Sequence, residues 1–163
     1  MRILGIDPGT VRTGWGIVDR DGNRLRGVAA GVFELGKSKP LPTRLLALEL
    51  GLAGVIDEHR PVVMAIESVF YAKYANAAIK LGHARGVAML VAARSELEVH
   101  EYPPAIVKRT VAGRGQSDKL QVGRLVGAIL GWRELPSEDA TDALAIAVTH
   151  AQAARAPRPA AKR

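Results

Sequence analysis

Two acidic residues of this chain each end a short apolar run. Asp7 closes the run that begins at Ile3, and Glu67 closes the run that begins at Val62. Each run predicts a buried strand. If the two strands are parallel neighbours, their carboxylates emerge side by side at the carboxyl edge of the sheet, where open α/β sheets usually carry their sites. Either acid alone is explained more simply as a charge that ends a buried strand at the surface, but the pairing favours a site.

A second acidic pair, Asp139 and Asp142, opens a segment with a polar start and an apolar body. The spacing of three places both side chains on one helix face. By itself this segment is explained by an ordinary helix start, because acids in the first turn complement the helix dipole. Beside Asp7 and Glu67, however, the pair would complete a group of four carboxylates that repel one another unless divalent cations lie among them. Hard oxygen ligands at that density suit Mg²⁺ or Mn²⁺.

The charge of the chain is concentrated in one segment. The sequence has 23 Lys and Arg against 16 Asp and Glu, a net charge of +7 and a pI of about 10.1. Residues 104–133 hold six basic side chains and one acid, and so carry most of the excess. Such a segment favours a polyanionic partner, most simply nucleic acid. Carboxylates beside a basic surface are the combination expected for phosphodiester hydrolysis by two metal ions.

Several classes of site are excluded by composition. The chain has no cysteine, which excludes disulfides, thiolate metal sites and cysteine nucleophiles. Its four histidines are scattered without metal-ligand spacing, and neither a Gly-x-Ser-x-Gly elbow nor a Walker-type phosphate loop occurs. The longest apolar run, Val87–Ala93, is far shorter than the roughly 18 residues of a membrane-spanning helix. We expect a cytoplasmic protein with no membrane segment.

The elements that must position these acids follow from the apolar periodicity. Strands are expected at 3–7, 14–19 and 28–35 as an antiparallel meander, because their connections are too short to join parallel neighbours. A helix over 41–59 then leads to a strand over 62–67 that lies parallel to one of them. The remaining expected elements are a helix at 74–96, a strand at 97–102 and helices at 104–112, 118–131 and 137–154. This order predicts one α/β domain over 1–152, followed by a disordered basic Pro/Ala tail over 153–163.

Four blocks in the same order along residues 1–152 resemble the bacterial RuvC family of Holliday-junction resolvases. The blocks are Ile-Leu-Gly-Ile-Asp-Pro-Gly-Thr at 3–10, Ile-Glu-Ser-Val-Phe at 66–70, Lys-Leu-Gly-His-Ala-Arg-Gly at 80–86 and Asp-Ala-Thr-Asp-Ala-Leu-Ala-Ile-Ala at 139–147. The resemblance implies an RNase H-like fold, with a mixed five-stranded sheet and helices on both faces.

The resemblance also implies a reaction. Asp7, Glu67, Asp139 and Asp142 would be the catalytic, metal-binding acids, with two Mg²⁺ ions per site and Mn²⁺ as a possible substitute. The activity would be paired, symmetric nicking of four-way DNA junctions in recombination and repair, leaving 5′-phosphate and 3′-hydroxyl ends.

The DNA contacts expected on this basis come from basic and aromatic residues. Lys108 and Lys119 match basic positions near the scissile backbone, and Phe70 matches an aromatic that probes bases at the crossover. Arg114 and Arg124, in the same basic segment, are expected to contribute to DNA binding.

The implied partners are a second copy of the chain and the branch-migration proteins RuvA and RuvB. A homodimer suits the substrate, because a two-fold dimer presents two equivalent sites to the two symmetric strands of a junction. The expected helix over 74–96, with Gly82 and Gly86 in an alanine-rich stretch, would help to form it.

Two alternative hypotheses remain open at this stage. In the first, the chain is a basic junction-binding module whose acids are only helix caps and strand ends. In the second, Asp7-Pro8-Gly9-Thr10 is a phosphate-binding loop of the sugar-kinase and actin type. A chain of one domain leaves no room for the second domain and second phosphate loop of that fold.

Overall fold

The structure is a computed structural model that describes residues 1–68, 75–113, 119–134 and 136–153. Its centre is a five-stranded sheet with the strand order β3-β2-β1-β4-β5. The strands are β1 (Arg2–Asp7), β2 (Arg12–Asp21), β3 (Arg24–Glu34), β4 (Val63–Glu67) and β5 (Glu98–Tyr102). The first three strands pair in antiparallel fashion, whereas β4 is parallel to β1 and β5 is parallel to β4. The predicted mixed sheet is therefore confirmed.

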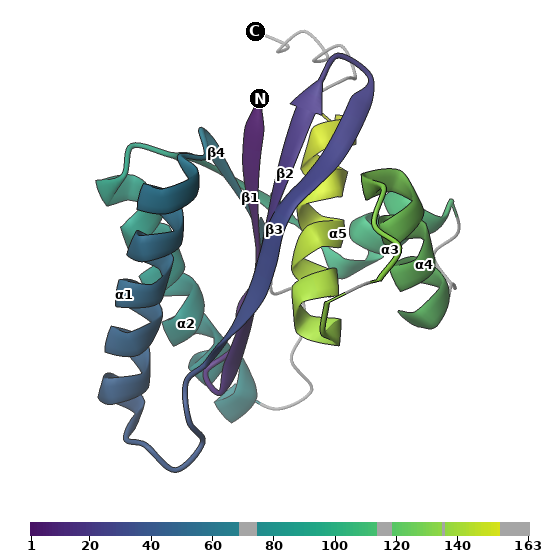
Figure 1. Ribbon diagram of the computed structural model, residues 1–163. Helices are drawn as coiled ribbons and strands as arrows, with labels where there is room; N and C mark the ends of the chain where they lie inside the picture. The colour runs from purple at the N-terminus through teal and green to yellow at the C-terminus, as the bar shows by residue number, and fades with distance from the viewer. Residues whose placement is uncertain (69–74, 114–118, 135, 154–163) are drawn as a thin grey trace, which may run out of the picture.

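Within the described residues, five helices cover the two faces of this sheet (Figure 1). They are α1 (Leu41–His59), α2 (Ala75–Arg94), α3 (Pro104–Ala112), α4 (Lys119–Leu130) and α5 (Glu138–Ala153). Helices α1 and α2 lie on one face, and α5, with α3 and α4 beside it, lies on the other. None of the described helices is long and apolar enough to cross a membrane.

The alternation of side chains along β1 divides the hydrophobic core into two layers. Leu4 and Ile6 are fully buried against α1 and α2, whereas Ile3 is buried on the side of α5. In β4, Met64 and Ile66 face α1 and α2, and Val63 faces α5. This period of two is the ordinary consequence of a pleated strand, and it also fixes the face to which the acids at the strand ends point.

Two of the strands are longer than the sequence pattern predicts. β2 and β3 extend to a two-residue turn at Gly22 and Asn23, where Gly22 has a φ of 52°. Most of the added residues are polar, so no apolar run marks them as strand in the sequence. Backbone pairing across the hairpin, rather than burial, holds these ends.

The boundaries of α1 show local sequence chemistry at work. The helix begins at a pair of prolines that flank Leu41, where a missing N–H costs nothing. It ends at Arg60, whose left-handed backbone (φ 50°) lets its N–H donate to the carbonyl of Ile56 at 2.8 Å. Pro61 follows and cannot continue the helix.

Candidate active site

The two acids at the strand ends lie level with each other. β1 and β4 are parallel neighbours in which Ile6 pairs with Ile66, so that Asp7 and Glu67 are the next residues along each strand. Gly5 and Ala65, two residues before Asp7 and Glu67, face α5. Because side chains alternate along a strand, Asp7 and Glu67 point to that same face of the sheet.

Glycines bring the start of α5 close to this strand end. Gly14 of β2 pairs directly with Asp7, and a methyl group on Gly14 would lie only 2.0 Å from the backbone oxygen of Asp139. Gly5, two residues before Asp7, is covered in the same way by the backbone of Ala143. Because no side chain separates the helix from the sheet at these points, the first turn of α5 lies beside Asp7.

An open pocket of about 350 Å³ forms where these elements meet. Three of its lining residues are acids from three different elements: Asp7, Glu67 and Asp142. Two are lysines, Lys108 from α3 and Lys119 from α4. The rest of the lining is mainly apolar and comes from Pro104, Val107, Val122, Ala145 and Ile146.

The electrostatics of the pocket penalise its own negative charge. The pKa of Asp7 is raised to about 7, first by burial and then by repulsion from Glu67, Asp142 and Asp139. Burial is also the largest cause that raises the pKa of Glu67 and that of Asp142, and the two carboxylates repel each other. Buried carboxylates that repel one another bind cations favourably, because a bound cation offsets both the loss of hydration and the mutual repulsion.

Lys119 supplies one such cation from the chain itself. Its Nζ contacts Glu138 and lies 3.5 Å from Oδ2 of Asp142. The hydrogen bond to Glu138 is the main reason that the pKa of Lys119 is raised, and the same bond lowers the pKa of Glu138. The lysine thus bridges two acids of the first turns of α5 at the mouth of the pocket.

The fourth predicted acid, Asp139, lies beside the pocket without lining it. Its Oδ2 is 3.0 Å from Nε of Arg12, and the same Nε is 3.0 Å from Oε1 of Glu34. Within the described part of the chain, no three His, Asp or Glu side chains converge closely enough to hold a metal ion as they stand. The four acids are neighbours, but two of them are engaged by basic side chains.

The donor set nevertheless fits a hard divalent cation. All the acidic groups at the pocket are carboxylates, and burial, followed by repulsion from the neighbouring acids, raises the pKa of Asp7 there. Oxygen donors of this kind suit Mg²⁺ or Mn²⁺ rather than a softer metal. Asp7, Glu67 and Asp142, which line the pocket, are the residues that would hold such ions.

A largely buried arginine anchors the strand end that carries Glu67. Arg85 of α2 donates to the backbone carbonyl of Glu67 and, at 2.7 Å, to Oε2 of Glu101 in the neighbouring part of β5. Its side chain is only 12% exposed. Arg85 thus ties the end of β4 to the helix layer behind it.

The predicted DNA-binding residues are placed as follows. Lys108 and Lys119 line the pocket, and Arg124 lines an adjoining hollow that shares Lys119 and Asp142 with it. Phe70 and Arg114 lie outside the described residues.

Three residues that lie at the site were not predicted from the sequence: Arg12, Arg85 and Glu138. Glu138 stands next to Asp139, and Arg85 lies within one of the four sequence blocks, so a signal existed for both. Arg12 gives no such signal, because its partner Asp139 is distant along the chain.

Comparison with known proteins identifies relatives over most of the chain. The family model described as crossover junction endodeoxyribonuclease RuvC matches residues 3–150. A crossover junction endodeoxyribonuclease RuvC from Afipia carboxidovorans is 52% identical over 151 residues, which are 93% of this chain and 88% of the relative. The solved structure of Thermus thermophilus RuvC in complex with Holliday junction substrate is 33% identical, covers 95% of each chain and has a TM-score of 0.89.

A more distant structure shares the fold alone. The yeast mitochondrial Holliday junction resolvase Ydc2 is 14% identical, covers 92% of this chain and 77% of its own, and has a TM-score of 0.66. With these neighbours, the mixed sheet and its helices confirm the predicted RNase H-like architecture.

Proposed function

Because the chain belongs to the RuvC family of crossover junction endodeoxyribonucleases, we propose that it cuts four-way DNA junctions at two symmetric positions. One observation carries the proposal to this chain: the pocket in which Asp7, Glu67 and Asp142 meet Lys108 and Lys119. Hydrolysis of a DNA backbone by metal ions requires carboxylates that bind the cations and basic side chains that bind the phosphates, and this pocket has both.

We infer that the catalytic acids are Asp7, Glu67, Asp139 and Asp142. The family is a nuclease family of the metal-dependent RNase H-like kind; for this chain we propose two Mg²⁺ ions per site, with Mn²⁺ as a substitute. When bound, such ions supply activation of the attacking water and stabilisation of the leaving oxygen. The acids would hold these ions from the ends of β1 and β4 and from the start of α5.

The basic side chains hold the substrate. Lys108 and Lys119 line the pocket and offer positive charge to the phosphate oxygens on either side of the scissile bond. Water attacks phosphorus, the bond to the 3′ oxygen breaks, and the products carry 5′-phosphate and 3′-hydroxyl ends. Arg124 extends the basic surface through the adjoining hollow. Contacts by Arg114, and stacking of Phe70 on a base at the crossover, remain parts of the proposal.

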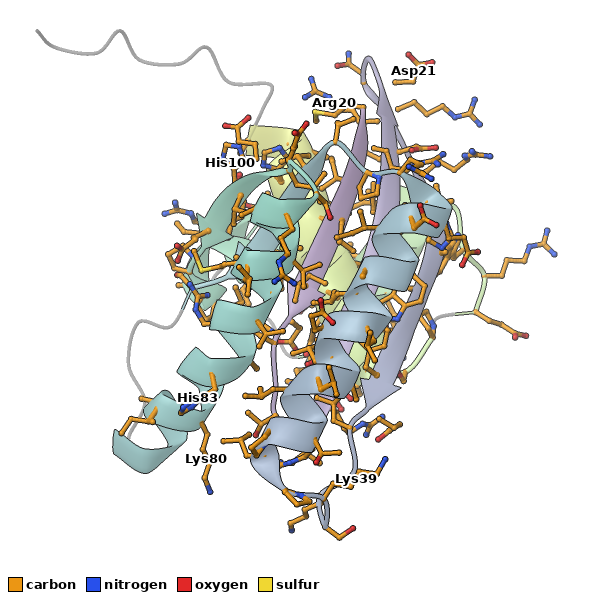
Figure 2. The ribbon with its side chains drawn as sticks, turned by 90° about the vertical axis from the view of Figure 1, so that its left-hand side faces the viewer. Arg20, Asp21, Lys39, Lys80, His83 and His100 are labelled. Atoms are coloured by element: carbon orange, nitrogen blue, oxygen red, sulfur yellow. The ribbon has the colours of Figure 1, made fainter. Side chains whose placement is uncertain are left out.

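The outer face of α2 supports the proposed homodimer. In Figure 2 this helix lies at the front beside α1, with Lys80 and His83 labelled on its N-terminal half. Ile79 and Leu90 are 59% and 51% exposed, and a methyl group on Gly82 or Gly86 would meet nothing within 4 Å. We propose that a second copy covers this apolar face of small residues, because a two-fold dimer matches the two-fold symmetry of the substrate.

Four further expectations from the sequence stay predictions. They are the association with RuvA and RuvB, the cytoplasmic location, the limits of the single domain at 1–152 and the disorder of the tail at 153–163.

The test is cleavage of a synthetic four-way junction with a mobile core, beside a linear duplex of the same sequence, in Mg²⁺, Mn²⁺ or EDTA. We expect paired nicks in the junction alone, and only with a divalent ion. The Asp7→Asn variant should bind the junction but not cut it. Binding without cleavage by the wild-type chain, across a panel of core sequences, would instead support a non-enzymatic junction-binding module.

A further inference from the structure

We propose that Arg12 is a positioning residue that holds Asp139 apart from the other three acids until a divalent cation displaces it, and so sets the metal affinity of the site. The inference rests on the proposed function, since it presumes that the acids bind metal. It concerns a residue outside the acids and lysines assigned above.

The contacts place Arg12 between two alternative acceptors. Its Nε lies 3.0 Å from Oδ2 of Asp139 and 3.0 Å from Oε1 of Glu34. Glu34 is its direct cross-strand partner in the β2–β3 hairpin. Arg12 lies two residues before Gly14 in β2, and the backbone of Gly14 lies against Asp139. Because side chains alternate along a strand, the side chain of Arg12 points to the α5 face of the sheet. The hairpin therefore holds a guanidinium at the outer side of Asp139.

The position of Asp139 makes this contact consequential. Asp139 precedes Asp142 by one helical turn, yet only Asp142 lines the pocket with Asp7 and Glu67. An Asp139 carboxylate that is paired with Arg12 has one oxygen engaged by a cation of the chain. A metal ion that uses this carboxylate has to compete with the guanidinium for it.

The exposure of the group makes the exchange easy. The side chains of Arg12, Asp139 and Glu34 are 47%, 33% and 66% exposed. Ion pairs of this exposure are weak, whereas coordination of a divalent ion by several carboxylates is not. When Asp139 turns to a metal ion, Glu34 remains as a partner for Arg12, so the released charge is not left unpaired.

The experiment measures Mn²⁺ binding to the full chain by isothermal titration calorimetry, without DNA. The variants are Arg12→Gln, Glu34→Gln and the two combined. Arg26→Gln is the control, because it removes an exposed arginine of the same hairpin, which lies near the turn at the other end and pairs with Asp19 instead of Asp139. Thermal melting in EDTA checks that each variant is folded.

We expect Arg12→Gln to bind Mn²⁺ about two- to fivefold more tightly, the range given by the loss of one exposed ion pair. Glu34→Gln should weaken binding, because the Arg12 ion pair that is left among the described residues is the one with Asp139. This effect should vanish in the Arg12→Gln background. Arg26→Gln should bind as the wild type does.

Two results would overturn the role of Arg12 alone. One is Mn²⁺ affinity in Arg12→Gln equal to that of a wild-type chain that binds the ion. The other is a change in Mn²⁺ affinity on Glu34→Gln that is the same with Arg12 present or replaced. Such a change would come from the loss of one negative charge near the site and not from the pairing of Glu34 with Arg12. Failure of the proposed function looks different: a folded wild-type chain that binds no Mn²⁺, or an Asp7→Asn variant that binds it equally well, would overturn the metal site itself.

Discussion

Replacement of Gly14 by alanine should separate α5 from the sheet and disable the site. The new methyl group would lie 2.0 Å from the backbone oxygen of Asp139 and 2.5 Å from its carbonyl carbon. Neither atom belongs to a flexible side chain, so relief requires the helix start or the strand to move by about 1 Å or more to restore van der Waals separation. Overpacking of this kind costs about 1–3 kcal/mol of the free energy of unfolding.

The same displacement should reduce cleavage more than it reduces stability. Asp139 and Asp142 would move with the helix, whereas Asp7, the direct cross-strand partner of Gly14, would stay with the sheet. A misplacement of about 1 Å between groups that act together can cost on the order of 100-fold in rate. Urea denaturation would measure the free energy of unfolding, and single-turnover cleavage of a junction would measure the rate.

A second glycine supplies the control. Gly54 lies within α1, and a methyl group there would meet nothing within 4 Å. Gly54→Ala should therefore stabilise the protein by about 0.5–1 kcal/mol, through the helix preference of alanine, without a change in cleavage rate. A Gly14→Ala variant that matches the wild type in both stability and cleavage would refute the argument that the α5–sheet distance positions the acids.

Three further predictions concern charge. In EDTA the pKa of Asp7 is raised from 3.8 to about 7, so the contribution of Asp7 to the free energy of unfolding falls as pH rises between these values. Urea denaturation at pH 8 should therefore show Asp7→Asn to be more stable than the wild type by about 1–4 kcal/mol. An unchanged free energy of unfolding would contradict the burial and repulsion assigned to Asp7. His150 is buried and its pKa is lowered to about 4, first by burial and then by His100. The neutral form is thus favoured on folding, and stability should fall by up to about 3 kcal/mol as pH drops from 6.5 to 4. His150→Asn should remove this slope, and an unchanged difference between variant and wild type across that range would refute it. Lys108→Ala should weaken junction binding in EDTA and lower the salt slope of log K by about 1, as measured by fluorescence anisotropy; an unchanged slope would exclude a phosphate contact.

The role of α5 follows from its place between sheet and pocket. The helix packs along β1 and β2, where the strands carry glycines, and every one of its residues from Ala143 to Ala151 is buried. Its first turns carry Glu138, Asp139 and Asp142, which are more exposed. A single element is therefore both the core of one layer and the carrier of half the predicted acids, so its docking and the geometry of the site cannot vary independently.

Much of this arrangement could be predicted because it depends on local periodicity. The apolar runs that end at Asp7 and Glu67 identified both strands and the edge at which they stop, and the spacing of Asp139 and Asp142 placed them on one helix face. The antiparallel start of the sheet and the parallel β4 followed from the lengths of the connections. Each of these inferences uses residues that are near in sequence and whose pattern repeats every two or every 3.6 positions.

Tertiary structure alone decided how the charges are shared. Asp139 is paired with Arg12 of β2, and Lys119 contacts Glu138 and Asp142 because α4 packs beside α5. Ion pairs between elements leave no periodic trace in a sequence, because any exposed acid can accept any arginine or lysine that the fold brings near it. The sequence by itself determined which residue types stand at the strand ends and the helix start; the packing of backbone on glycine, and the choice of partner for each carboxylate, were settled only by the folded chain.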